Sequence, residues 1–292
     1  MLVSDALDAT FSRDRLDTDY DARATVTVET FETIIEAYAS RTREAKRACL
    51  FVEDHPLEPD TGLTLDVYGR TDTPRPAVLF IHGGYWRALS KDHSGFMAPM
   101  LAGHGIVTIA PDYRLAPDVR FGEIVADIRK TFAHVWHHAA ELGIDRRRIV
   151  PVGSSAGGHL AASLLQPGWQ AEYDLPPVPV HAAMPVSGLF DLAPIARCHP
   201  QQWLGLNDAE IEDFSPLRHL PSPGPRIVTA LGEHEAPGFV RQSRAWHEAI
   251  VENGVHAEHI VIAGRNHFDV ILDLCDTRSK LARALLDLVA GC

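Results

Sequence analysis

A strand–turn–helix pattern at residues 149–163 constrains the fold of this chain more than any other feature. The apolar residues at 149–152 are typical of the end of a buried strand, and small residues at 161–163 favour a helix packed closely on a sheet. Between them, residues 153–157 match Gly-x-Ser-x-Gly with Ser155 at the centre. The two glycines leave room for a strained turn, in which a Cβ would crowd the serine. Strand, tight turn and helix form the context of a nucleophile elbow. The alternative is a Gly- and Ser-rich loop without chemistry, because five loosely specified positions can match by accident.

The size and composition of the chain fit one large α/β domain. With 292 residues, 46% of them hydrophobic, the chain can bury a sizeable core. Its formal net charge of −12 disfavours nucleic acid and anionic membranes as main partners. No stretch reaches the roughly 18 apolar residues of a membrane span, and residues 1–20 lack the basic and apolar regions of a signal peptide. Four scattered cysteines without a C-x-x-C pair favour free thiols in a reducing, cytoplasmic compartment: Cys49, Cys198, Cys275 and Cys292.

Apolar periodicity predicts alternating strands and helices along most of the chain. We therefore expect a mostly parallel sheet with helices on both faces, in a single domain over residues 1–292. Residues 1–24 are expected to form a polar lead-in, and the irregular residues 192–220 a small cap over the sheet edge. Besides the strand at the elbow, strands are expected at 48–53, 62–69, 77–81, 105–110, 180–187, 226–231 and 256–262. Besides the elbow helix, helices are expected at 27–47, 122–142, 239–253 and 272–288.

A base for Ser155 is expected at His267, the last histidine that follows a predicted strand. A serine is a poor nucleophile until a base takes its proton and donors hold the oxyanion. His267 lies between the last strand and the terminal helix, which matches the serine–acid–histidine order of α/β-hydrolases. The alternative is a surface loop histidine, one of 16 in the chain.

The acid of such a triad is expected on the loop after the strand at 226–231. Glu233 and Glu235 are the candidates there, since this loop carries no aspartate. A carboxylate at this place would orient the imidazole and stabilise its charged form. Asp191, after the preceding strand, is a weaker alternative, and both glutamates could instead be solvated loop charges.

A glycine pair after the strand at 77–81 is the candidate oxyanion loop. His82 is followed by Gly83 and Gly84, where an HGGG-type loop is expected in this fold. Glycines let backbone N–H groups point inward without obstruction by a Cβ. With the N–H of Ala156, the two glycines would supply two or three donors. The alternative is an ordinary Gly-Gly turn.

Metal and cofactor chemistry find no support in the sequence. His134 and His138 are four residues apart on a predicted helix, a spacing that can bind zinc, but the Glu of H-E-x-x-H is missing. We expect them to be surface histidines. Neither a P-loop nor a dinucleotide fingerprint is present, so no cofactor and no metal are expected.

With these motifs placed, the chain resembles the kynurenine formamidase (arylformamidase) branch of the α/β-hydrolases, from about residue 20 to the C-terminus. In this family the triad is Ser-Asp-His, and its aspartate falls on Glu235 here. Glutamate is one methylene longer but is an accepted triad acid in this fold. The residues that carry the resemblance are His-Gly-Gly-Tyr-Trp at 82–86 and the segments 90–97, 153–160, 187–194 and 242–243. Residues 112–117 look equally like the hormone-sensitive-lipase-like esterases, whose Asp-Pro acid loop is missing here.

The resemblance implies acyl transfer on a small-molecule substrate. Ser155 would attack a formamide carbonyl, as in the conversion of N-formylkynurenine to kynurenine plus formate, with His267 as the base and Glu235 orienting it. Two alternatives stay open: a carboxylesterase of small acyl or aryl esters, and a non-catalytic binding protein that kept the fold.

The substrate pocket is expected to be small and partly aromatic. From their placement beside the motifs, its lining residues are expected to be Tyr85, Trp86, His159 and Phe239. A homodimer is compatible with this fold, although no patch that would form a dimer interface can be recognised in the sequence.

Overall fold

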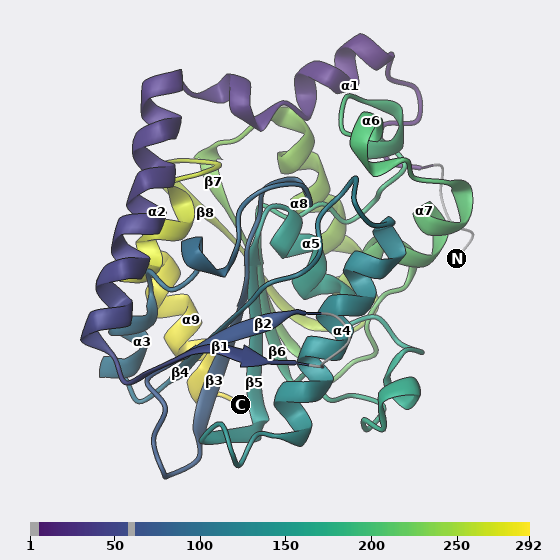
Figure 1. Ribbon diagram of the computed structural model, residues 1–292. Coiled ribbons are helices and arrows are strands. Elements are labelled where there is room, and N and C mark those ends of the chain that lie inside the picture. Colours follow the sequence, from purple (N-terminus) through teal and green to yellow (C-terminus); the bar gives the residue numbers. More distant parts are fainter. Residues whose placement is uncertain (1–5, 58–61) are drawn as a thin grey trace.

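The computed structural model describes residues 6–57 and 62–292, and its centre is an eight-stranded sheet (Figure 1). The hydrogen-bonded order is β1-β2-β4-β3-β5-β6-β7-β8. β2 runs antiparallel to both of its neighbours, and all pairs from β4 to β8 are parallel. The mostly parallel sheet that the sequence predicts is thereby confirmed. The strands are β1 (Phe51–Pro56), β2 (Thr64–Tyr68), β3 (Arg75–Ile81), β4 (Val107–Pro111), β5 (Ile144–Ser154), β6 (Ala182–Val186), β7 (Arg226–His234) and β8 (His256–Asn266).

The central strands read as continuous apolar runs because helices cover both faces of the sheet. Along β3, Ala77, Leu79 and Ile81 pack into one core, and Val78 and Phe80 pack into the other. The first core lies under α4 (Phe121–His137), α5 (Ala156–Ser163) and α8 (Pro237–Glu252). The second lies under α2 (Val28–Ala48), α3 (Ala98–Gly103) and α9 (Lys280–Ala290).

Short helices fill the connections between these elements. Four of them, η4, α6, α7 and η5, lie within residues 192–220, which we call the cap segment. The short helices are α1 (Arg13–Asp19), η1 (Ala22–Thr25), η2 (Lys91–His93), η3 (Gln170–Tyr173), η4 (Ile195–Arg197), α6 (Gln201–Leu204), α7 (Asp208–Phe214), η5 (Pro216–Arg218) and η6 (Val270–Cys275).

The lead-in is more structured than the sequence predicts. Residues 1–5 lie outside the described part of the chain, but Leu16 of α1 and the following Tyr20 are buried in the core. Arg241 of α8 fastens this segment, because it lies 2.7 Å from a carboxylate oxygen of both Asp8 and Asp19. Helix α1 therefore packs beside α8 and η4, next to α6 at the top of Figure 1.

The last helix begins later than the predicted 272. The segment Val270–Cys275 forms η6, and α9 starts only at Lys280. Ser279 joins the two helices and caps the second: its hydroxyl donates to the Asp273 carbonyl at 2.7 Å and accepts from the Ala282 N–H at 2.9 Å. Such side-chain bonds to the backbone compete with a continuous helix, which makes the prediction of one helix over 272–288 wrong.

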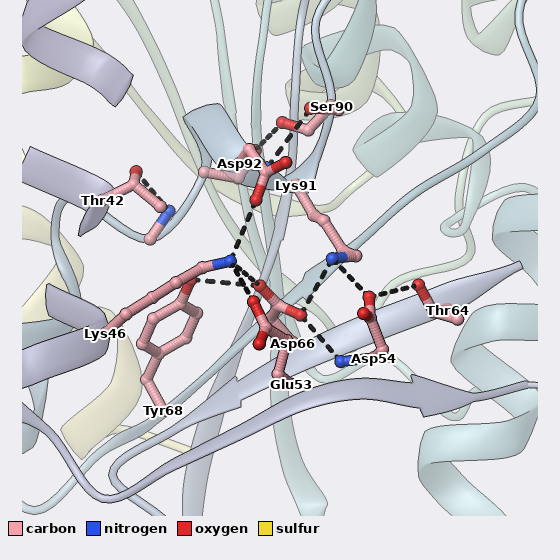
Figure 2. A network of polar contacts seen from close by, with 12 residues as sticks. Thr42, Lys46, Glu53, Asp54, Thr64, Asp66, Tyr68, Ser90, Lys91 and Asp92 are labelled. Atoms are coloured by element: carbon pink, nitrogen blue, oxygen red, sulfur yellow. Dashed lines mark hydrogen bonds and ion pairs between the residues drawn. The ribbon is translucent and has the colours of Figure 1, made fainter. Parts of the chain in front are cut away.

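A buried ion-pair network joins α2 to the β1–β2 hairpin and to η2 (Figure 2). Its centre is the fully buried carboxylate of Asp66 on β2, which lies 3.2 Å from Lys46 Nζ and 3.1 Å from Lys91 Nζ. The backbone N–H of Lys91 also donates to Asp112 Oδ1 at 2.8 Å. The network thus fixes the far end of the loop that leaves β3 at His82.

Candidate active site

Ser155 occupies a strained turn between β5 and α5. Its φ of 58° and ψ of −118° are unusual for a residue with a side chain, and its N–H donates to the Val186 carbonyl at 2.8 Å. A Cβ on Gly153 would lie 2.1 Å from the Gly157 oxygen, and one on Gly157 would lie 2.0 Å from the Ile81 oxygen. Backbone therefore crosses so closely here that both positions require glycine, as the elbow interpretation expects.

His267 and Glu235 meet at the carboxyl ends of the last two strands. The Nδ1 atom of His267 lies 2.6 Å from Oε2 of Glu235, and both side chains are almost completely buried. Because a carboxylate only accepts, the proton of the neutral imidazole lies on Nδ1 and leaves Nε2 as a proton acceptor. The other carboxylate oxygen accepts from Ser187 Oγ at 2.5 Å and from the Gly232 N–H at 3.2 Å.

Hydrogen bonding keeps Glu235 ionised despite its burial. Burial alone would raise the pKa of this carboxyl group. The hydrogen bonds from His267, Ser187 and Gly232, and the attraction of the imidazole when it is protonated, outweigh burial. The pKa of Glu235 therefore lies below its ordinary value. A negative charge is therefore held beside the imidazole at neutral pH.

The two other candidate acids point elsewhere. Glu233 is exposed, and its carboxylate accepts from the Gly264 N–H at 2.8 Å. Asp191 accepts from the backbone N–H groups of Leu7, at 2.8 Å, and Ala193, at 3.0 Å. Of the three carboxylates, Glu235 is the one in contact with His267.

The glycine pair after β3 brings backbone against the elbow. A Cβ on Gly83 would lie 2.8 Å from the Ser154 oxygen and 3.3 Å from the Ser155 Cβ. Gly84 has a φ of +98°, and a Cβ there would lie 2.2 Å from the Ala88 oxygen. Beside them, the N–H of Ala156 belongs to the first turn of α5 and has no partner within the helix. Gly83 and Ala156 thus lie directly beside Ser155, and Gly84 lines the same cavity as Ser155.

A cavity of about 810 Å³ opens onto Ser155 and His267. Its wall combines residues of the first 40 positions with the loop after β3, the cap segment and the start of η6. One part of the wall is apolar: Phe31, Ile35, Tyr38, Phe80, Phe96, Phe268 and Ile271. Another part is polar: Asp17, Asp21, Arg23, Arg87, His93 and His199.

Comparison with known proteins shows the family of this chain. The BD-FAE family model matches residues 65–204. The kynurenine formamidase of Danio rerio is 30% identical over 262 residues, which cover 87% of this chain and 87% of that protein. The Salmo salar enzyme is 30% identical over 263 residues with the same coverage of both chains. The chain belongs to the kynurenine formamidase family.

More distant similarities place this family member among the α/β-hydrolases. The esterase LipC of Mycobacterium tuberculosis is 28% identical, covering 65% of this chain and 53% of LipC. A Silicibacter protein assigned as a thioesterase superposes with a TM-score of 0.79 at 26% identity, covering 94% of this chain and 98% of that one. An arylesterase structure shares the fold, with a TM-score of 0.69 at 22% identity and coverage of 96% and 97%. The chain is therefore a hydrolase with the α/β-hydrolase fold, as the sequence predicts.

Of the four residues expected to line the pocket of this formamidase-family chain, Tyr85 lies in the cavity wall and three do not. Trp86 and His159 are fully buried against each other, with ring centroids 5.2 Å apart. Phe239 lies behind His267, 4.4 Å between ring centroids. These three side chains support the loop, the elbow helix and the imidazole from outside the cavity.

Sequence reasoning missed the contribution of the N-terminal segment to the cavity. Tyr20, Arg23, Phe31 and Tyr38 all lie in the wall, yet no motif marks them. A signal was present in the apolar pair Leu16 and Tyr20, since residues four apart share a helix face.

Metal-binding clusters and helices that could span a membrane are both absent from the described residues. Within 6–57 and 62–292, no group of three or more His, Cys, Asp or Glu could hold a metal ion. His134 and His138 are half-buried rather than on the open surface, and His134 Nε2 lies 3.0 Å from His55 Nε2. In the same described ranges, no helix has the length and hydrophobicity needed to cross a bilayer.

Proposed function

We propose that this chain hydrolyses aryl formamides, converting N-formylkynurenine to kynurenine plus formate through an acyl-serine intermediate. The observation that carries the proposal is the buried contact between His267 Nδ1 and Glu235 Oε2, 2.6 Å long, beside the cavity that Ser155 also lines. Two kynurenine formamidases at 30% identity support the choice of a formamide as substrate.

In the first half of the proposed reaction, the Ser155 hydroxyl attacks the formyl carbon as its proton passes to His267 Nε2. The charge that develops on the imidazole is stabilised by Glu235, which is ionised and fixed by its hydrogen bonds. His267 then gives the proton to the aryl amine nitrogen as the C–N bond breaks. Kynurenine leaves, and the formyl group stays on Ser155 as an ester.

In the second half, water replaces the amine as the partner of His267. The imidazole takes a proton from water, the hydroxyl attacks the formyl ester, and the proton returns to Ser155 as formate leaves. In both halves the carbonyl oxygen becomes an oxyanion, for which we propose the N–H groups of Gly83, Gly84 and Ala156 as donors. Loss of one such donor costs about 2.7–4 kcal/mol of transition-state stabilisation.

The alternative is a carboxylesterase of small acyl or aryl esters. The relation to LipC favours it, and the same nucleophile, base and oxyanion donors would serve an ester. The two functions differ in the leaving group, because an amine must be protonated before it departs while a phenol leaves more easily. The ratio of kcat/KM between matched formamides and esters separates them.

The experiment is steady-state kinetics on N-formylkynurenine beside p-nitrophenyl acetate, for the natural chain and for Ser155→Ala. A strong preference for the formamide, abolished in Ser155→Ala, supports the formamidase. Slow turnover of the formamide with rapid cleavage of the ester would show that the chain is a carboxylesterase instead. The matched control is Ser163→Ala on the same helix, whose hydroxyl only donates to the Leu160 carbonyl; it should keep activity on both substrates.

We further propose a cytoplasmic setting and a small-molecule substrate as the only partner that the chemistry needs. All four cysteines lie in the described part of the chain and are free thiols, which suits a reducing compartment. A homodimer is compatible with this proposal, but every residue proposed for the reaction comes from a single chain.

A further inference from the structure

Arg87 is a cation in the cavity wall whose side chain has no carboxylate partner among the described residues. It lies three residues after Gly84, and its backbone N–H donates to the Gly84 carbonyl at 3.0 Å. A turn of this kind keeps the two Cα atoms within about 7 Å of each other. Arg87 therefore belongs to the same loop as the proposed oxyanion donors Gly83 and Gly84. One β-turn separates its backbone from Gly84, and its long side chain carries the guanidinium further away.

The aromatic platform beneath Arg87 is itself fixed. The guanidinium carbon lies 4.4 Å from the ring centroid of Trp203 in the cap segment. The indole N–H of Trp203 donates to the Tyr85 carbonyl at 3.1 Å, which ties the cap segment to the loop. Stacking of this kind holds a guanidinium by its face and leaves the N–H donors on its edge free for a ligand.

The other charged groups of the cavity wall already form hydrogen bonds or ion pairs within the protein. Asp17 accepts from a cap-segment N–H at 2.5 Å and pairs with an arginine of its own helix at 3.6 Å. Asp21 caps η1 through the Ala24 N–H at 3.1 Å. Arg23 donates to the Val26 carbonyl at 2.9 Å. In the described part of the chain, Arg87 is the charged wall residue for whose side chain no hydrogen bond or ion pair is formed.

We propose that Arg87 binds a carboxylate on the substrate, at the end remote from the scissile bond, and so selects aryl formamides that carry a carboxylate. Planar guanidinium and carboxylate groups match in a two-pronged hydrogen bond, which is stronger and more directional than a neutral one. The cavity that Gly83, Gly84 and Arg87 all line has a volume of about 810 Å³, which leaves room for an aromatic ring and a short chain. The inference rests on the proposed function only for the identity of the scissile group.

The test measures binding in the inactive Ser155→Ala background, so that no turnover is needed. Calorimetry gives Kd for N-formylkynurenine and for its α-carboxamide, which differ in the charge of one group. In Ser155→Ala we expect the carboxylate to bind more tightly. Adding Arg87→Gln should raise the Kd of the carboxylate ligand roughly 10- to 100-fold, which corresponds to the loss of a hydrogen bond to a charged group. The Kd of the carboxamide should change less than about 2-fold. Arg87→Lys keeps the charge but cannot form the two-pronged hydrogen bond, so it should weaken binding of the carboxylate by an intermediate factor.

Two arginine variants sharpen the result. Arg13→Gln, on α1 and outside the cavity wall, should leave both Kd values unchanged. Arg23→Gln tests the competing assignment of the anion to the other wall arginine. The proposal is overturned if Arg87→Gln weakens both ligands equally or neither, if Arg23→Gln removes the preference, or if the Ser155→Ala protein binds neither ligand. A chain that binds the carboxylate through Arg87 but fails to hydrolyse the formamide would refute the proposed function alone.

Discussion

At the scale of single residues, two glutamates on one loop have different surroundings and should have different effects. Glu235 contacts His267 inside the protein, and Glu233 bonds to a backbone N–H at the surface. Glu235→Gln keeps the size of the side chain but removes the charge that orients the imidazole, so we expect kcat to fall about 10³- to 10⁴-fold. Glu233→Gln should keep kcat within about 2-fold. Steady-state kinetics on one substrate compares them, and equal losses would contradict the assignment.

Ser187 should tune the pH at which Glu235 loses its charge. Its hydroxyl donates to the Glu235 carboxylate at 2.5 Å, which helps to hold the pKa of that group below its ordinary value. In Ser187→Ala this pKa rises, so the part of the acidic limb of the kcat/KM profile that reports protonation of Glu235 should move to higher pH. Activity at neutral pH should fall roughly 3- to 10-fold, the value of one ordinary hydrogen bond.

A pH–rate profile of Ser187→Ala beside Ser163→Ala checks this prediction. Ser163 is also buried, but its hydroxyl bonds only within its own helix. A shift of the acidic limb that is the same in both variants would mean that packing, not the carboxylate, responds to the loss of a hydroxyl group.

At the scale of elements, the network around Asp66 should determine how firmly α2 and η2 are held to the sheet (Figure 2). Asp66→Asn removes the one buried negative charge between Lys46 and Lys91, and leaves the nearly buried ammonium of Lys91 with less compensation. Breaking a buried pair in this way costs about 3–5 kcal/mol. Urea denaturation should show a loss of this order in the free energy of unfolding.

The comparison for Asp66→Asn is an exposed ion pair on α2. Arg43 lies 2.7 Å from Glu36, with more than half of each side chain accessible, so Arg43→Gln should leave the urea midpoint unchanged. If both variants unfold at the natural midpoint, the Asp66 network has no effect on stability.

Elements with a strong local pattern could be predicted from the sequence. Helix α2, predicted at 27–47, lies at Val28–Ala48, because its apolar residues recur at helical spacing. Strand β3 shows its burial on both faces as an unbroken apolar run. The lead-in and the final helix were predicted less well, since the outcome there depends on single capping residues such as Ser279 and on a distant partner, Arg241.

In the candidate site, too, the motif residues could be predicted from the sequence and most of the cavity wall could not. Its motif residues are set by local backbone geometry, and Gly153 and Gly157 mark the elbow because a Cβ has no room there. The cavity wall depends instead on how distant loops meet. Trp86 is next to Tyr85 in sequence, yet one faces the core and the other the cavity. Nothing in the local sequence distinguishes these two orientations.

At the scale of the whole molecule, buried neutral histidines should make the protein sensitive to acid. His82 and His159 are buried, and burial lowers the pKa of each to about 4, against about 6.5 in an unfolded chain. Between these values the unfolded chain binds protons that the folded chain does not, so stability falls as the pH falls from about 6.5 to 4.

Thermal unfolding across this pH range measures the effect. The melting temperature should drop as the pH is lowered, and the drop should be smaller in His159→Gln, which removes one of the two groups. His256→Gln, at an exposed position on β8, should keep the natural slope. An identical slope in all three proteins would show that these histidines do not govern the acid response.

The way the cavity is assembled has a consequence for the newly made protein. Tyr20 and His267 face the same space, although the ribosome makes them nearly 250 residues apart. At roughly 5–20 residues per second, synthesis of His267 follows that of Tyr20 by on the order of ten to fifty seconds. Until then the apolar side of the cavity has no opposite wall, and a chaperone that shields it would protect the nascent chain from aggregation. The chemistry proposed for Ser155 can start only when His267 has left the exit tunnel.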